Sequence, residues 1–193
     1  IGPTGLPLDP TSAVSLKQSK KQYHDAVLAL IEHPFDALYF TGFKSLDDAQ
    51  CALMGARAVY DGPVLISLVP NEEGMLSGGR TLSEGVALCD EYGADVIGVV
   101  SDAPARVLVG FAKEMASSTD KPLLVDVSVR RKDRRQFEPT DENPYPTADA
   151  IVELAVRLRA QGVQFLRASG AATPAYTGAL LATVGGSDVV VPQ

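Results

Sequence analysis

The sequence predicts an α/β protein built on a parallel sheet. Five short apolar runs alternate with segments of helical periodicity along the 193 residues. They recur at intervals of about 30 residues, the usual length of a strand, helix and connection. The clearest run, Asp95 to Val100, is interrupted only by Gly98, as in a strand covered on both faces. We therefore expect parallel strands joined by right-handed helical crossovers.

The helix before that run carries both a start and a stop signal. Thr81 and Glu84 are three residues apart, the spacing of a capping box, and Leu82, Val86 and Cys89 follow at helical spacing. Gly93 comes after the last periodic residue, where a left-handed glycine commonly ends a helix. A helix should therefore begin near Leu82.

Polar residues follow the apolar run directly. Ser101 and Asp102 stand at its carboxyl end, and parallel α/β folds place their chemistry at that edge of the sheet. These two residues are the first candidates for a functional site.

The remaining elements repeat the pattern. Ile1 to Pro10 is expected to be a loop that leaves a strand lying upstream, and a long charged loop is expected from Val129 to Pro146. Further strands are predicted at residues 36–43, 63–70, 122–128 and 164–170. Further helices are predicted at 15–31, from the cap Ser45 to the stop at 61–63, at 104–116, from the cap Thr147 to Gly162, and at 173–184. We expect one domain over residues 1–184, with 185–193 as a linker or tail and a strand stub at 189–191.

Composition excludes several classes of protein. A net charge of -7 disfavours nucleic-acid binding, although residues 130–135 form a local basic run. No apolar stretch approaches the roughly 20 residues that a membrane span needs. Cys51 and Cys89 fall at core-facing helical positions, which indicates a reducing compartment, and we expect the cytoplasm. Periodicity leaves the sheet type open, because five strands suit a flavodoxin-like sheet and are too few for a closed eight-stranded barrel.

Five motifs follow one another along the chain. They are IGPTG at residues 1–5, DALYFTGFKSLDDA at 36–49, PVLISLV at 63–69, the segment 72–99, and GVQFLRASGAATPAYTGAL at 162–180. In this order they resemble the homocysteine S-methyltransferase family: the turn after its third strand, its fourth strand and following helix, its fifth strand, its GR-LSG loop and sixth strand, and its closing GGCCGTTPEHI. The resemblance implies a partial (β/α)8 TIM barrel that supplies strands four to eight and lacks about the first third.

The same resemblance implies that the zinc ligands are replaced. The family binds Zn²⁺ through one cysteine at the end of strand six and a pair at the end of strand eight, and these positions here are Ser101, Ser169 and Gly170. Zinc prefers charged thiolates, so we expect no metal and no cofactor. The family's strand-four glutamate falls on Thr41, and its PNAG segment becomes residues 126–131. Because the lost residues cluster at the chemical end of the scaffold, the pattern indicates a changed function.

The converging strand ends predict a polar pocket for a small anionic or zwitterionic ligand. The expected substrate-binding residues are Thr41, Ser101, Asp102, Asp126, Arg167 and Ser169, with Ser128 beside them. Two purely structural roles compete with this: Asp102 capping the helix after Pro104, and Arg167 pairing with an acidic loop residue. Asp126 lies within an apolar strand, where burial requires either a ligand or an internal partner.

Three functions follow as hypotheses. The chain could be a scaffold or small-ligand domain in a methyl-transfer protein, without zinc-dependent thiol methylation. It could be an active methyltransferase acting on a thiol or small amino acid, or an open-sheet α/β small-molecule binding module. Because an incomplete barrel exposes two strand edges, we expect a partner that covers them. Candidates are the missing strands, a corrinoid or folate methyl-transfer module, or an oligomeric or two-chain assembly.

Overall fold

Five parallel strands form one sheet, and their order across the sheet is their order along the chain. The computed structural model describes residues 1–132 and 135–187. The sheet order is β1-β2-β5-β6-β7, and each neighbouring pair is parallel. The strands are Leu38–Phe43 (β1), Val64–Leu68 (β2), Val96–Ser101 (β5), Leu123–Val129 (β6) and Val163–Gly170 (β7). An order without reversal has no topological switch point, so the sheet is wound as in a (β/α)8 barrel and not as in flavodoxin.

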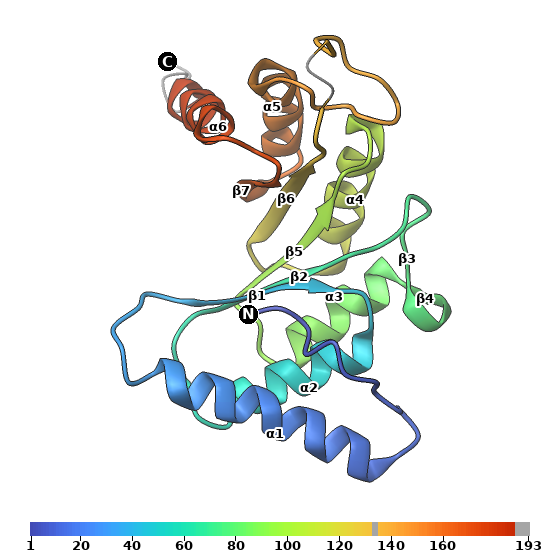
Figure 1. The fold of residues 1–193 in the computed structure, drawn as a ribbon, viewed down its shortest axis with the longest axis vertical. Coiled ribbons are helices and arrows are strands. Elements are labelled where there is room, and N and C mark those ends of the chain that lie inside the picture. Colours follow the sequence, from blue (N-terminus) through green and yellow to red (C-terminus); the bar gives the residue numbers. More distant parts are fainter. Residues whose placement is uncertain (133–134, 188–193) are drawn as a thin grey trace.

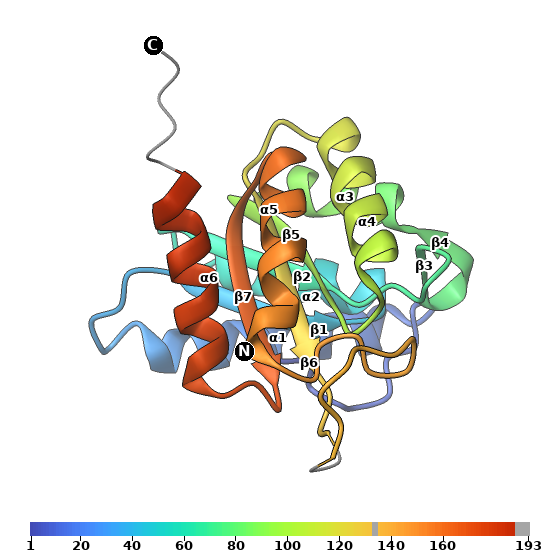
Figure 2. The ribbon, with the colours of Figure 1, turned by 90° about the horizontal axis from the view of Figure 1, so that it is seen from above.

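Six helices lie on the outer side of this sheet. Figure 1 shows the sheet curving so that the helices surround its convex side, while the concave side opens toward the left of the view. Figure 2, turned by 90°, shows α5 and α6 in front of β6 and β7. The helices are Ala13–Leu30 (α1), Leu46–Arg57 (α2), Leu82–Glu91 (α3), Ala105–Ser118 (α4), Val152–Ala160 (α5) and Pro174–Ser187 (α6). The architecture is that of a partial barrel, as the sequence predicts.

The core lies between the helices and the convex face of the sheet. Phe40 and Phe43 of β1 are fully buried and pack with Tyr23 of α1 at ring-centroid distances of 6.1 and 6.0 Å. Because side chains alternate along a strand, the two sequence neighbours of Phe40, Tyr39 and Thr41, belong to the concave face. The pleat therefore separates an apolar layer under the helices from a partly polar layer on the other side.

Close backbone contact joins α1 to α2. A Cβ atom added to Gly55 would lie 2.6 Å from the Lys20 carbonyl oxygen and 2.9 Å from the His24 nitrogen. No side chain fits between the two helices at this point. Gly55 therefore sets their separation.

The helix signals in the sequence are correct at two of the three predicted caps and wrong at the third. Ser45 caps α2 through Asp48 N–H, and Thr81 and Glu84 form the full capping box of α3. Thr147 makes no side-chain cap, because the chain first forms a 3-10 turn at Ala148–Ile151 (η2) before α5 begins. The first helix also starts two residues earlier than predicted, capped by Ser12.

The first residue lies beside β1, and the last helix extends further than the sequence predicts. Ile1 donates a backbone hydrogen bond to the Tyr39 carbonyl (2.8 Å) and accepts one from Thr41 N–H (2.9 Å). It thereby lies at the free edge of β1 as one residue of a parallel neighbour would. At the other end, α6 continues through Ser187, where the sequence predicts a linker from Gly185. The predicted stub at 189–191 lies outside the described residues.

The glycine-containing loop before α3 is more regular than expected. It contains a short antiparallel ribbon made of Met75–Leu76 (β3) and Arg80–Thr81 (β4), joined by a 3-10 turn at Ser77–Gly79 (η1).

Over the described part of the chain, no helix combines the length and the apolarity that crossing a bilayer requires.

Candidate functional site

Asp126 and Arg167 lie opposite each other on the concave face. They are register partners on β6 and β7, and Arg167 Nη1 donates to Asp126 Oδ2. The Asp126 side chain is 0% exposed, whereas that of Arg167 is 49% exposed. The pair joins a buried anion to a cation that reaches solvent.

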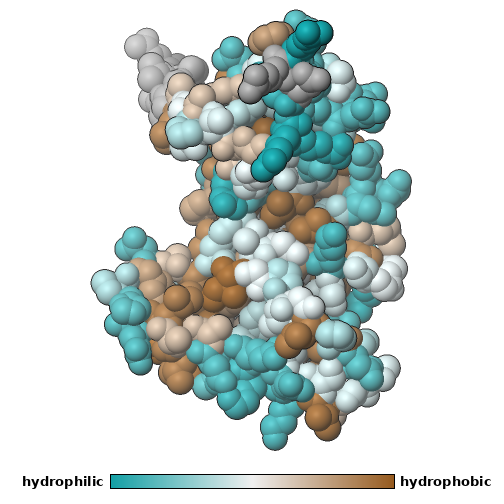
Figure 3. Space-filling model, viewed as in Figure 1, coloured by the Kyte–Doolittle hydropathy of each residue, from teal (hydrophilic) through white to brown (hydrophobic). Residues whose placement is uncertain are grey.

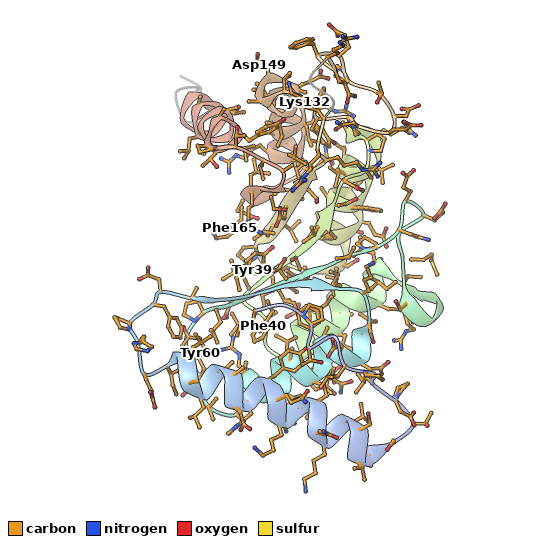
Figure 4. All side chains as sticks on the ribbon, in the orientation of Figure 1. Tyr39, Phe40, Tyr60, Lys132, Asp149 and Phe165 are labelled. Carbon is orange, nitrogen blue, oxygen red and sulfur yellow. The ribbon has the colours of Figure 1, made fainter. Side chains whose placement is uncertain are left out.

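Three hydroxyl groups extend this pair toward β1 and β2. The Tyr39 hydroxyl lies 2.9 Å from Ser67 Oγ and 3.5 Å from Asp126 Oδ2, and Ser67 Oγ donates to Thr41 Oγ1 at 3.1 Å. The Arg167 guanidinium lies 5.6 Å from the Tyr39 ring centroid, within cation–π range. We call Tyr39, Thr41, Ser67, Asp126 and Arg167 the concave cluster. Four strands contribute to it, so only the folded sheet assembles it, and Figure 4 shows Tyr39 near the middle of the concave side.

One oxygen of the concave cluster has no partner. Asp126 Oδ1 is buried and accepts no hydrogen bond from any residue between 1 and 132 or between 135 and 187. Leaving a buried carboxylate oxygen unsatisfied costs about 1–3 kcal/mol or more. A hydrogen-bond donor that reaches Oδ1 would recover that cost.

Electrostatics in the concave cluster favour a charged Arg167 and a neutral Tyr39. Burial alone would lower the pKa of the Arg167 guanidinium, but the Asp126 carboxylate outweighs it and the pKa is raised. Burial raises the pKa of the Tyr39 phenol, against the hydrogen bonds from Ser67 and Thr41. Tyr39 can therefore act as a hydrogen-bond donor and not as a base.

The structure brings together three of the six predicted binding residues. Thr41, Asp126 and Arg167 belong to the concave cluster. Ser101 lies elsewhere, where its Oγ accepts from Ala103 N–H at 3.1 Å in the turn after β5. Asp102 accepts from Arg130 Nε at 2.6 Å.

Both competing structural roles proposed from the sequence are wrong. The position before α4 is Pro104 and receives no side-chain cap, so Asp102 does not cap that helix. Arg167 pairs with a strand residue and not with an acidic loop residue. Ser169, the remaining predicted residue, lies opposite Ser128 in the register of β6 and β7, near the carboxyl ends of both strands.

Sequence comparison identifies the family of this scaffold. The profile of the homocysteine S-methyltransferase family matches residues 1–185. The chain belongs to the homocysteine S-methyltransferase family. A comparison with curated proteins gives no match.

Solved structures agree on the fold. The homocysteine methyltransferase MmuM from Escherichia coli superposes in its apo form with a TM-score of 0.73 at 17% identity, over 95% of this chain and 60% of that one. Its metallated form gives a TM-score of 0.70 at 17% identity, over 90% and 54%. An isomerase from Streptomyces coelicolor gives 0.52 at 12% identity, over 95% and 50%. The chain thus spans 50 to 60% of the length of these proteins.

The positions where the resemblance puts the zinc ligands of the homocysteine S-methyltransferase family do not fit that metal. Two carry hydroxyls, Ser101 and Ser169, and the third is Gly170 with φ of +68°. A Cβ atom there would lie 2.6 Å from the Val129 carbonyl oxygen. The backbone at Gly170 thus resists any side chain, thiolate or other. Within the described part of the chain, no three His, Cys, Asp or Glu side chains cluster as metal ligands would.

Sequence reasoning missed two members of the concave cluster, Tyr39 and Ser67. Each carried a signal in strand alternation. Tyr39 is two residues before Thr41 and so shares its face, and Ser67 is the one polar residue in the run VLISLV. Alternation counted from Thr41 would have found Tyr39.

Proposed function

We propose that this chain is a homocysteine S-methyltransferase-like domain that holds a small ligand on its concave face without zinc-dependent thiol methylation. The unpartnered, buried Asp126 Oδ1 beside the Arg167 guanidinium is the observation that carries this proposal. A buried acceptor and a half-exposed cation next to each other favour a ligand that offers both a donor and an anionic group.

The ligand we propose is a small zwitterion or anion. A hydroxyl or ammonium group would donate to Asp126 Oδ1, and a carboxylate would accept from the guanidinium N–H groups that Asp126 leaves free. Thr41 and Ser67 would hold the Tyr39 hydroxyl in place beside it. Arg167 would keep its charge throughout, because its raised pKa lies far above neutral pH.

The same proposal excludes thiol activation at the family's metal position. Activating a thiol requires a Lewis acid or a base close to the sulfur, and Ser101, Ser169 and Gly170 offer neither. Ser101 Oγ is already engaged by Ala103 N–H. We therefore assign the chain to ligand binding or scaffolding within a methyl-transfer protein, with a corrinoid or folate module as its proposed partner.

Two measurements on the purified chain test this. Elemental analysis after zinc loading and gel filtration should give far less than one zinc per chain. Calorimetric titration with homocysteine, as a probe with an amine and a carboxylate, should show saturable binding that Asp126→Asn weakens at least about tenfold. Asp120→Asn, at an exposed aspartate outside the concave cluster, is the matched control and should bind as the parent does.

Stoichiometric zinc together with homocysteine methylation would overturn the proposal in favour of an active methyltransferase. Equal losses in the Asp126→Asn and Asp120→Asn variants would remove the concave cluster as the ligand site.

A further inference from the structure

A second pocket lies at the carboxyl ends of β6 and β7. Its volume is about 530 Å³, within the range of small-molecule sites. The loop after β6 and the segment from β7 into α6 form its two sides, and we call it the mouth pocket. Its floor is apolar, with Val129, Ala148 and Ala171 among the residues that line it. It includes no residue of the concave cluster.

The rim of the mouth pocket is basic. Arg130, Arg131 and Lys132 line it, and its described lining contains no aspartate or glutamate. Figure 4 shows Lys132 in the loop beyond β6, and Figure 3 shows strongly hydrophilic residues over that part of the surface. This run of three basic residues contrasts with the net charge of -7 of the whole chain.

Two of these three charges meet no carboxylate in the described parts of the chain. Arg130 is bound on both sides, by Asp102 Oδ2 and by the Glu142 carbonyl oxygen, each at 2.6 Å. Arg131 is exposed and forms no ion pair with any acidic side chain in the described ranges. Lys132 lies 5.1 Å from the ring centroid of Phe137 and forms no ion pair with an acidic side chain of residues 1–132 or 135–187.

The amino end of α6 adds a third source of positive potential. Thr173 and Ala175 line the mouth pocket at the start of this 14-residue helix. The first N–H groups of a helix lack intrahelical acceptors, and the helix dipole carries about half a positive charge there. In barrels of this type, the loops after the last two strands and a helix amino end commonly form a phosphate site.

We propose that the mouth pocket binds a phosphate monoester with an apolar body. A phosphate monoester carries about two negative charges at neutral pH, which matches the charges of Arg131 and Lys132 and the amino end of a helix. A carboxylate supplies only one charge and two oxygens. The apolar floor would contact the body of the ester, so inorganic phosphate should bind more weakly than an aryl phosphate.

Phenyl phosphate titrated into the full chain is the direct test, followed by calorimetry at low and moderate salt. We expect saturable binding that weakens with salt. It should fall at least about tenfold in Arg131→Gln/Lys132→Gln. The control Lys44→Gln/Lys113→Gln removes the same charge from exposed lysines outside the pocket and should retain binding.

Two further variants separate this site from folding effects and from the concave cluster. Ala175→Glu puts a carboxylate at the amino end of α6, which favours the helix but should abolish phosphate binding. Asp126→Asn should bind phenyl phosphate unchanged, whatever it does to homocysteine. Three results would each overturn the proposal: no saturable binding of phenyl phosphate, equal affinity for benzoate, or equal loss of affinity in Arg131→Gln/Lys132→Gln and in the control Lys44→Gln/Lys113→Gln.

Discussion

Arg167 and Asp126 pair across adjacent strands, with the carboxylate fully buried and the guanidinium half exposed. Removing one partner of this ion pair affects the two remaining charges differently. Arg167 without Asp126 could still be hydrated, whereas Asp126 without Arg167 would retain only the long contact with Tyr39.

That asymmetry predicts the stability of two variants. Arg167→Met should lower the free energy of unfolding by about 1–3 kcal/mol, because it leaves a buried carboxylate without its charged partner. The double variant Asp126→Leu/Arg167→Met should be closer to the parent, because apolar side chains need no partner. Urea denaturation measures both. A double variant less stable than Arg167→Met would contradict this reading.

Gly170 should not accept a cysteine. Its φ of +68° and the 2.6 Å approach of a Cβ atom to Val129 O make Gly170→Cys strained. We expect a loss of about 1–3 kcal/mol of folding free energy. Ser169→Cys, at the adjacent position, should lose less than half as much. Thermal unfolding of the two variants decides whether the backbone at 170 resists the family's thiolate.

Two helical glycines should respond to alanine with opposite signs. Gly55→Ala would push a methyl group against the α1 backbone at 2.6 Å and should destabilise the protein. Gly110→Ala in α4 meets no atom within 4 Å and should stabilise by about 0.5–1 kcal/mol through helix propensity. Equal shifts in the two melting temperatures would show that α1 and α2 are not held apart by Gly55.

The two cysteines should be unreactive in the folded chain. Cys89 is fully buried, and burial raises the pKa of its thiol to about 12. Burial also raises the pKa of the Cys51 thiol. Since the thiolate is the reactive form, a thiol reagent at pH 8 should modify both residues only after denaturant is added. Rapid modification of native protein would contradict the buried positions.

Asp95 should contribute pH-dependent stability at the amino ends of the strands. Burial alone would raise the pKa of its carboxyl, but hydrogen bonds from Val64 N–H (2.8 Å) and Arg57 Nη2 (2.7 Å) outweigh it and lower the pKa. A lowered folded pKa gives stability that is present above the unfolded pKa of about 3.9 and lost as the pH falls through the folded value. Because the Asp95 side chain is 48% exposed, solvent screening weakens its interactions, and Asp95→Asn should cost less than about 1 kcal/mol at pH 7. The cost should be smaller still below pH 4, measured by denaturation at both pH values.

Local chemistry made much of the fold predictable. The capping box at Thr81 and Glu84 and the cap at Ser45 act within one turn, so residues close in sequence define them. The prediction that Thr147 caps the helix was wrong, because a 3-10 turn lies between Thr147 and the start of α5. The last helix, predicted to end at Val184 before a linker from Gly185, continues through Ser187, because glycine permits a helix to end without requiring it to.

The sequence by itself determined the strand and helix alternation and the family, and it put Ser101, Ser169 and Gly170 at the positions that the resemblance assigns to the zinc ligands. These features depend on residue type and short spacing. Only the tertiary structure decided that Asp102 pairs with Arg130 and that Asp126 pairs with Arg167, and only it placed Tyr39 and Ser67 beside the Asp126–Arg167 pair. Those contacts join residues that are 28 to 87 positions apart in the sequence, and they depend on the register between neighbouring strands. Register is set by the packing of the whole sheet, which no local pattern encodes.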